Sequence, residues 1–155
     1  MAESSTPLVS VVIPTCDRPA QLARCLASIE ATLRPWPIEV VVVDDGSATP
    51  LDAVLSPFRT TVAATLVRQS NSGSGVARNT GVAHANGRYV VFLDDDCALE
   101  HGTVVAFVEA LHDEPGAIVG GRTRLGRDRP ARPAGIGAQR ERRLTGAGCS
   151  RSVAA

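Results

Sequence analysis

Lysine is absent from this 155-residue sequence, and all 16 of its basic residues are arginines. The missing lysine argues against a receiver-like regulatory module, because such a module needs a lysine beside its acidic pocket. Aromatic residues make up only 3% of the chain, and no apolar run approaches the ~20 residues that cross a bilayer. The first apolar run, 8–13, stops at Pro14 and follows no basic segment, unlike a signal peptide. We therefore expect a soluble protein with no transmembrane segment.

The four cysteines are far apart and form no Cys-x-x-Cys pair, the spacing of many zinc and redox sites. They are Cys16, Cys25, Cys97 and Cys149. We expect reduced, mostly structural thiols in a reducing compartment. This predicts a cytoplasmic location, with the inner face of a membrane as the alternative.

Acidic and basic residues balance at 16 each, which argues against a wholly basic nucleic-acid binder. We expect no nucleic-acid partner. The balance is a cancellation, because residues 1–121 hold seven arginines and fourteen acids, whereas residues 122–155 hold nine arginines and two acids. The second segment is rich in Arg, Gly and Pro and poor in large apolar residues, so we expect a disordered tail at 122–155. We expect a flexible N-terminus at 1–7 and one folded domain at 8–121.

Short runs of β-branched residues alternate with helical patterns over the folded segment. We predict strands at 8–13, 38–43, 61–67, 89–93 and 117–119. We predict helices with an apolar stripe over 22–33, a short one near 51–55, one from the Gly-rich loop to about 85, and one at 101–112. Asp17 is the expected N-cap of the first helix. The alternation predicts an α/β fold with a doubly wound, mostly parallel, Rossmann-like sheet and right-handed crossovers, whose ligands bind beyond the carboxyl ends of the strands.

Acidic residues follow two of these strands. Asp44 and Asp45 lead into Gly46-Ser47, which is also the pattern of a plain turn with an N-capping serine. Asp94-Asp95-Asp96 follow the fourth strand, where three neighbouring carboxylates repel one another. Hard oxygen ligands gathered in this way suit Mg²⁺ or Mn²⁺ with substrate phosphates, and a solvated acidic loop is the alternative.

A Gly-rich segment, Asn71 to Gly81, lies between the third strand and its helix. Free backbone N–H groups at a helix N-terminus bind anions, and Arg78 adds a guanidinium for phosphate, although a flexible start to the helix remains the simpler explanation. The segment is not a dinucleotide fingerprint, because Arg78 replaces the third glycine and the loop does not follow the first strand.

Four motifs together are more specific than any one of them. In chain order they are Pro14-Thr15-x-x-Arg18, Asp44-Asp45-Gly46-Ser47, Asn71-x-Gly73-x-x-x-Ala77-Arg78-Asn79-x-Gly81 and Asp94-x-Asp96. This is the order and placement of the motifs of family 2 glycosyltransferases. Over about Val9 to Gly121 the chain closely resembles the nucleotide-sugar-binding half of a GT-A-fold enzyme of that family.

The resemblance implies specific roles for the motif residues. It implies a nucleoside pocket at Pro14 and Thr15, uracil and ribose recognition at Asp44 with Asp45, and a basic residue near the nucleotide at Arg78. It implies a D-x-D pair in which Asp94 is nearer the ribose and Asp96 holds the divalent cation, Mn²⁺ or Mg²⁺. The full nucleotide-sugar-binding set is Pro14, Thr15, Arg18, Asp44, Asp45, Gly73, Arg78, Asp94 and Asp95, with Asp96 and Asp94 as metal ligands.

The implied reaction is inverting transfer of a sugar from a nucleotide donor, first of all a UDP-sugar, to an unknown acceptor hydroxyl. Inversion needs a general base, which the family supplies from its acceptor half. We expect the chain to be truncated before that half and to have a sheet edge exposed to self-association. Glu141 lacks the setting of a base, and Cys97 stands where many relatives carry an acid. A catalytically silent nucleotide-binding remnant is the main alternative, and an NAD-dependent dehydrogenase is a weaker one, because the loop after the first strand has no glycine.

Overall fold

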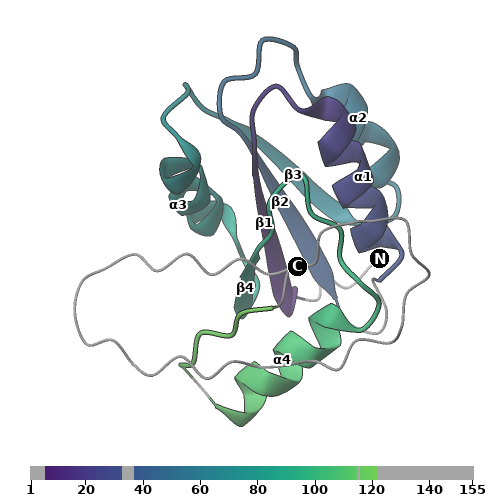
Figure 1. Ribbon diagram of the computed structural model, residues 1–155, viewed down its shortest axis with the longest axis vertical. Coiled ribbons are helices and arrows are strands. Elements are labelled where there is room, and N and C mark those ends of the chain that lie inside the picture. Colours follow the sequence, from purple (N-terminus) through teal and green to yellow (C-terminus); the bar gives the residue numbers. More distant parts are fainter. Residues whose placement is uncertain (1–5, 33–36, 115, 122–155) are drawn as a thin grey trace.

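The computed structural model describes residues 6–32, 37–114 and 116–121, in which four strands alternate with four helices (Figure 1). The strands are β1 (Val9–Thr15), β2 (Ile38–Asp44), β3 (Ala63–Arg68) and β4 (Tyr89–Phe92). The helices are α1 (Pro19–Glu30), α2 (Asp52–Phe58), α3 (Ser74–His84) and α4 (Thr103–Asp113). None of these helices has both the length and the apolar character that a membrane span requires. The predicted tail at 122–155, with Glu141 and Cys149, lies outside the described residues.

The strands form one parallel sheet in the order β3-β2-β1-β4. β1 is therefore central and pairs with β2 on one side and β4 on the other. Its register places Thr15 beside Asp44 and Val12 beside Phe92, so the strands end at one common edge. The strand order reverses at β1, as the alternation of strands and helices predicts for a doubly wound sheet. The predicted α/β fold class is confirmed.

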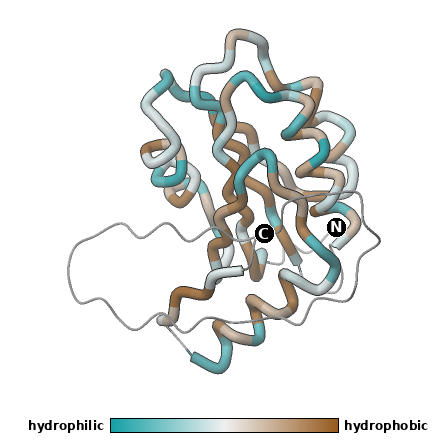
Figure 2. The backbone as a smooth tube through the Cα atoms, viewed as in Figure 1, coloured by the Kyte–Doolittle hydropathy of each residue, from teal (hydrophilic) through white to brown (hydrophobic). Residues whose placement is uncertain are grey.

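Helices cover both faces of the sheet. On one face, β1 and β2 contribute every second valine to a core that includes buried side chains of α1, α2 and α4. On the other face, Val12, Val41 and Val43 pack with Ala77 of α3. The strands consequently form the most apolar part of the chain, and they lie between the helices (Figure 2). Burial of each such valine contributes roughly 1.5–3 kcal/mol. Because both faces of the sheet are covered, the central strands are apolar on both faces and show no alternation.

The α3 helix lies unusually close to β1. A Cβ atom added at Gly81 would lie 2.2 Å from Cγ1 of Val12, so only a glycine fits between the helix and the strand. Ala77, one turn earlier on the same side of α3, is fully buried against the sheet. Two of the small residues in the Gly-rich motif are thus required by packing, and they bring Arg78 close to the sheet edge.

At the opposite end of the sheet, the Glu39 carboxylate joins three segments. It accepts hydrogen bonds from Ser10 Oγ at 2.5 Å, from the Asn86 backbone N–H at 2.5 Å and from the Gly87 backbone N–H at 3.2 Å. Burial by itself would raise the pKa of Glu39, but these hydrogen bonds outweigh it and lower the pKa below its usual value. This charged group therefore holds the loop between α3 and β4 against the start of β1 and β2.

Two local predictions are wrong. Residues 117–119 form no strand, because the chain turns as it leaves α4: the Ala117 N–H donates to the Glu114 carbonyl, and Gly116 has φ of +83°. Asp17 does not cap α1, whose N-cap is Arg18 without a side-chain hydrogen bond. Asp17 has φ of +55°, and its carboxylate accepts from the Ala48 N–H instead. Other boundaries differ by two or three residues: β1 ends at Thr15, α2 ends at Phe58, β3 begins at Ala63 and α4 begins at Thr103.

We expect Gly81→Ala to lower the free energy of unfolding by about 1–3 kcal/mol, because the new methyl group overlaps Val12 and overpacking of this kind is costly. Gly75→Ala is the matched control in the same helix, since a Cβ there meets no atom within 4 Å. The control should be as stable as the wild type or slightly more so, because alanine favours helix. Urea unfolding of the three proteins measures the difference. Equal stability of the two variants would contradict the close packing.

Candidate functional site

A cleft of about 1010 Å³ opens at the carboxyl ends of β1 and β4. This is the point where the strand order reverses, which is where doubly wound sheets bind ligands. Most of the site residues predicted from the sequence line it. They are Pro14, Thr15, Arg18, Asp45, Arg78, Asp94, Asp95 and Asp96.

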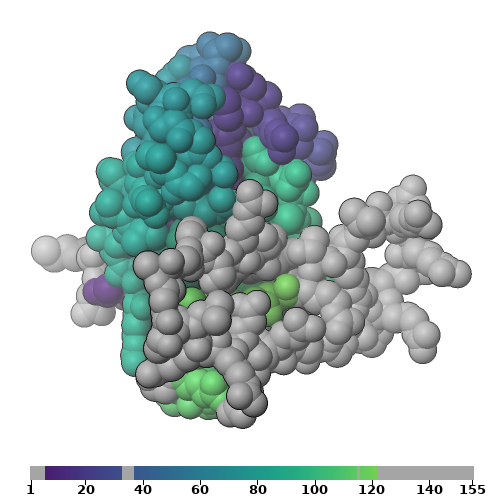
Figure 3. Space-filling model, turned by 60° about the vertical axis from the view of Figure 1, so that its left-hand side comes forward, coloured from purple at the N-terminus to yellow at the C-terminus, as the bar shows by residue number. Residues whose placement is uncertain are grey.

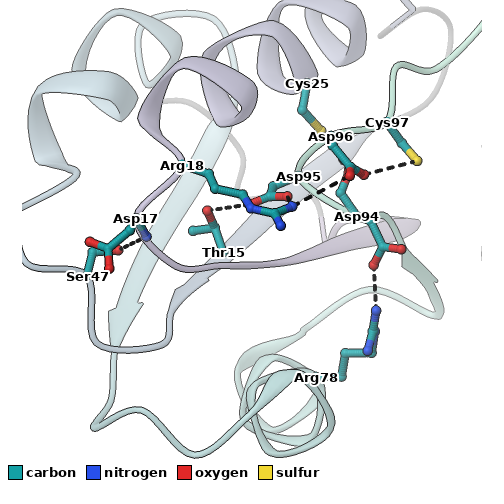
Figure 4. A network of polar contacts seen from close by, with 10 residues as sticks. All are labelled: Thr15, Asp17, Arg18, Cys25, Ser47, Arg78, Asp94, Asp95, Asp96 and Cys97. Carbon is teal, nitrogen blue, oxygen red and sulfur yellow. Dashed lines mark hydrogen bonds and ion pairs between the residues drawn. The ribbon is translucent and has the colours of Figure 1, made fainter. Parts of the chain in front are cut away.

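Asp95 joins the loop after β4 to the end of β1. Its Oδ2 atom accepts a hydrogen bond of 2.7 Å from Thr15 Oγ1, across 80 residues of sequence, and both side chains are buried. A buried hydrogen bond to a carboxylate is stronger than one between neutral groups. Asp95 is therefore anchored between the strands, whereas its neighbours Asp94 and Asp96 are more exposed (Figure 4).

Two arginines approach the row of aspartates from different elements. Arg18 comes from the start of α1, and its Nη1 atom lies 3.4 Å from Asp95 Oδ1 and 3.5 Å from Asp96 Oδ2. Arg78 comes from α3, and its Nη2 atom lies 2.5 Å from Asp94 Oδ1. Figure 4 shows the two guanidinium groups reaching the aspartates separately. The site thus holds both charge signs, with basic groups for phosphate and acidic groups for a cation.

Asp45 holds the start of the Gly-rich loop. It accepts hydrogen bonds from the Ser72 N–H at 2.8 Å, from Gln69 Nε2 at 2.8 Å and from the Gly73 N–H at 2.9 Å. Burial would raise the pKa of Asp45, but these three donors outweigh it and hold the pKa below its usual value. Gly73 itself has φ of +89°, a conformation that favours glycine, and it precedes the first residue of α3. The loop geometry therefore depends on a charged Asp45.

Asp44 lies beneath the cleft and is not part of its lining. Its Oδ1 atom accepts from the Ser47 N–H at 2.8 Å, and its Oδ2 atom is 3.6 Å from Arg68 Nη1. Oδ2 is buried and has no hydrogen-bond partner among the described residues. Sequence reasoning missed Arg68, which is Asp44's neighbour in the β2–β3 register. The only signal for it was its place as a basic residue at the end of the third predicted strand.

An apolar wall completes the cleft and was also missed from the sequence. Its members come from β4, α4 and the segment after α4, and they are Val90, Val91, Phe92, Phe107, Leu111, Ala117, Ile118 and Val119. Ile118 is 65% exposed, whereas Val119 packs against the core. In the space-filling view α3 (teal) lies on the near face, and light green residues of the α4 region lie below it (Figure 3). The residues predicted as a fifth strand thus line the cleft without pairing in the sheet.

The sequence profile of glycosyl transferase family 2 matches residues 10–147. The chain belongs to this family. The match includes residues 122–147, which are beyond the segment on which the motif resemblance rests. It agrees with the order of the four motifs, each of which contributes residues to the cleft, and it sets aside the dehydrogenase alternative.

Several characterised family members are similar in sequence. The chain is 34% identical to glycosyltransferase AglE of Haloferax volcanii over 98 residues, which cover 61% of this chain and 32% of AglE. It is 32% identical to hyaluronan synthase of Pasteurella multocida over 117 residues, covering 74% of this chain and 12% of that protein. The chain therefore spans a third or less of the length of these two relatives.

Solved structures of family enzymes share the fold. Mannosyltransferase PcManGT of Pyrobaculum calidifontis, in complex with GDP-Man and Mn²⁺, has a TM-score of 0.68 and 28% identity, over 81% of this chain and 38% of that one. TarS 1–349 of S. aureus, in complex with UDP-GlcNAc, has a TM-score of 0.65 and 27% identity, over 79% of this chain and 37% of that one. The chain thus has a GT-A-type fold.

The carboxylates of the cleft fit a divalent cation only in part. Among the described residues, no three His, Cys, Asp or Glu side chains are gathered for a metal. Asp94 and Asp96 nevertheless offer oxygen donors at the cleft surface, and Mg²⁺-type sites commonly use one or two carboxylates with substrate phosphates. Asp95 is less suited, because both of its oxygens already have partners. The donor set therefore agrees with a site that is complete only when a diphosphate is present.

The cysteines in the described part of the chain are free thiols, at Cys16, Cys25 and Cys97. Burial, and then the negative neighbours of the acidic cluster, raises the pKa of Cys25 to about 12. Cys25 Sγ contacts the Asp94 carbonyl at 3.7 Å and packs in the core. These thiols are protonated at neutral pH, as expected of structural cysteines.

We expect Asp45→Asn to lower the free energy of unfolding by about 1–3 kcal/mol at pH 7, because the amide cannot accept all three hydrogen bonds. The folded-state pKa of Asp45 is depressed, so its contribution is complete above the usual carboxyl value of about 3.9 and is lost as pH falls through the folded pKa. The difference in the free energy of unfolding between the wild type and Asp45→Asn should therefore become smaller below about pH 4.

Urea unfolding at several pH values measures this narrowing. The control is Asp113→Asn, which removes an 82% exposed carboxylate at the end of α4 and should change stability little at any pH. A difference between wild type and Asp45→Asn that stayed constant down to pH 3 would show that the charge of Asp45 does not hold the loop.

Proposed function

We propose that this chain binds a nucleotide-diphospho-sugar, first of all a UDP-sugar, together with Mn²⁺ or Mg²⁺. We propose that the bound sugar is transferred to an acceptor hydroxyl with inversion at the anomeric carbon. One observation carries the proposal: the end of β1, the start of α3 and the aspartates after β4 converge on one cleft, although they are up to 80 residues apart. That PcManGT is in complex with GDP-Man and Mn²⁺, and TarS with UDP-GlcNAc, supports a donor of this class.

The nucleoside would lie against Pro14 and Thr15, with Asp45 and the Gly-rich loop beside it. Pro14 and Thr15 line the cleft at the end of the central strand, so they form a rigid wall. Asp45 already holds the N–H groups of Ser72 and Gly73, and this fixes the backbone that a ribose or base would contact. Asp44 acts from below, where it positions the Ser47 turn and pairs with Arg68.

The diphosphate would lie between α3 and the aspartates after β4. Arg78 is fixed on α3 by the close packing of that helix on β1, and its guanidinium points into the cleft. Asp94 and Asp96 would hold the divalent cation that accompanies the diphosphate. A bound divalent cation supplies charge stabilisation for the nucleoside-diphosphate leaving group. Asp95 positions the segment through Thr15 and would not be a metal ligand.

A catalytically silent nucleotide-binding protein is the alternative to an enzyme. An inverting enzyme needs a general base. Among the described residues, each carboxylate that lines the cleft is already paired with a backbone N–H, a hydroxyl or an arginine, so none of them stands out as that base. Release of UDP or GDP from a panel of sugar nucleotides, with and without simple acceptors, separates the two. Turnover above background favours the enzyme, and tight binding without turnover favours the silent protein.

We expect UDP with Mn²⁺ to raise the melting temperature. A site filled at about 100 times its dissociation constant gains roughly 2.7 kcal/mol, which is a shift of roughly 5–10 °C for a chain of this size. Differential scanning fluorimetry with UDP, GDP and their sugar conjugates, each with and without Mn²⁺, measures it. The absence of a shift with all of these ligands would refute the proposed donor site.

The metal-dependent part of the shift should disappear in Asp96→Asn. The Asp96 side chain is 58% exposed, so this variant should keep the melting temperature of the free protein and lose only the response to Mn²⁺. Asp113→Asn is the control with the same charge change on the exposed end of α4. A full Mn²⁺ response in Asp96→Asn would remove Asp96 from the proposed metal ligands.

A further inference from the structure

The Arg18 side chain contacts two of the three aspartates that follow β4. Its Nη1 atom lies between Asp95 Oδ1 and Asp96 Oδ2, at 3.4 and 3.5 Å (Figure 4). Asp95 is held from the other side by Thr15, so the arginine is drawn toward an anchored carboxylate. Among the described residues, Asp96 also accepts a weak contact of 3.8 Å from Cys97 Sγ. Arg18 is therefore the cation that neutralises the most exposed aspartate of the row.

The backbone around Arg18 directs the side chain into the cleft. Asp17, with its positive φ, donates its N–H to Ser47 Oγ and accepts from the Ala48 N–H. The Arg18 carbonyl accepts from the Leu22 N–H in the first turn of α1. These contacts hold the chain on both sides of Arg18, while its side chain is half exposed.

The charges in this part of the cleft depend on what is bound. Three aspartates face two guanidinium groups, with Arg18 on Asp95 and Asp96 and Arg78 on Asp94. A divalent cation arriving alone must compete with Arg18 for Asp96 and with Arg78 for Asp94, and it then lies beside two positive groups that have each lost one carboxylate partner. A diphosphate arriving with the metal gives the displaced guanidinium groups new acceptors, to which arginine binds well.

We propose that Arg18 is an internal counter-ion that competes with the divalent cation for Asp96 and passes to the diphosphate when the donor binds. Arg18 thereby makes metal binding depend on the nucleotide, and by linkage it makes nucleotide binding depend on the metal. This inference rests on the proposed donor function and adds a positioning role for Arg18 within that site.

The experiment measures Mn²⁺ binding by the loss of the free Mn²⁺ electron paramagnetic resonance signal, with and without UDP. In the wild type we expect weak binding of Mn²⁺ alone and at least tenfold tighter binding with UDP, within the usual range of ligand coupling. In Arg18→Met, Mn²⁺ alone should bind about two- to fivefold more tightly, the size expected when an exposed ion pair no longer competes. The enhancement by UDP should shrink, because the diphosphate loses one partner.

Two further variants separate local competition from general effects. Arg59→Met removes one positive charge from α2's end, where Arg59 pairs with Asp52 at 3.9 Å, and it should bind Mn²⁺ like the wild type. Arg18→Lys keeps a positive charge near Asp96 and should remain within about twofold of the wild type, since the competing charge is retained. Because Arg59→Met removes the same charge elsewhere, a gain in Mn²⁺ affinity confined to Arg18→Met is specific to the cleft.

The inference is overturned if Arg18→Met binds Mn²⁺ alone no more tightly than Arg59→Met does. It is also overturned if the UDP enhancement is the same in Arg18→Met and in the wild type. Failure of the donor proposal is a different result: UDP and GDP then leave Mn²⁺ binding and the melting temperature of the wild type unchanged. The comparison of Mn²⁺ alone between variants still tests the competition by Arg18 in that case.

Discussion

The central position of β1 is the constraint on which the site depends. This strand is buried along its whole length and forms parallel ladders with β2 and β4, so the carboxyl ends of the three strands have fixed relative positions. Thr15 ends β1, Asp44 is its neighbour on β2, and Leu93 continues β4 by donating its N–H to the Val12 carbonyl. A one-residue slip in either ladder would turn every side chain to the opposite face. The relative positions of the cleft residues therefore follow from the register of buried, apolar strands.

The three consecutive aspartates show how this constraint gives neighbouring residues different roles. Leu93 continues β4, and the chain then enters a turn in which the Cys97 N–H donates to the Asp94 carbonyl, so consecutive aspartates point in different directions. All three aspartates line the cleft, but Asp95 is buried, like Leu93 before it, whereas Asp94 and Asp96 are more exposed. Asp95 can form its hydrogen bond with Thr15 only because it has the inward orientation. A run that looks uniform in sequence is thus one anchor with a potential ligand on each side.

Much of the fold could be predicted from the sequence because its signals are local. Buried β-branched runs gave β1 and β2 nearly to the residue, and the alternation with helices gave the parallel sheet. The strand at 117–119 was predicted wrongly, because three apolar residues are too few to show whether they pair with a strand or line a cavity. Asp17 was misassigned because its partners, Ser47 and Ala48, are 30 residues away in sequence.

The candidate site was predictable in its membership and not in its internal contacts. Motif spacing placed eight of the predicted residues around the cleft, but no spacing shows that Asp45 holds the Gly-rich loop or that Asp44 is covered by Arg68. Such pairings depend on strand register and on the close approach of α3 to β1, which a single glycine permits.

The charge pattern connects the composition to the site. Residues 1–121 carry twice as many acids as arginines, and a row of like charges in a cleft would by itself repel and spread apart. The structure avoids this by giving the outward aspartates separate arginines, drawn from α1 and α3. Because an arginine can exchange a carboxylate for a phosphate without losing a charged partner, these contacts are compatible with the anionic ligand that we propose for the cleft. The acidic excess is consequently compatible with binding a diphosphate, provided that a cation arrives with it.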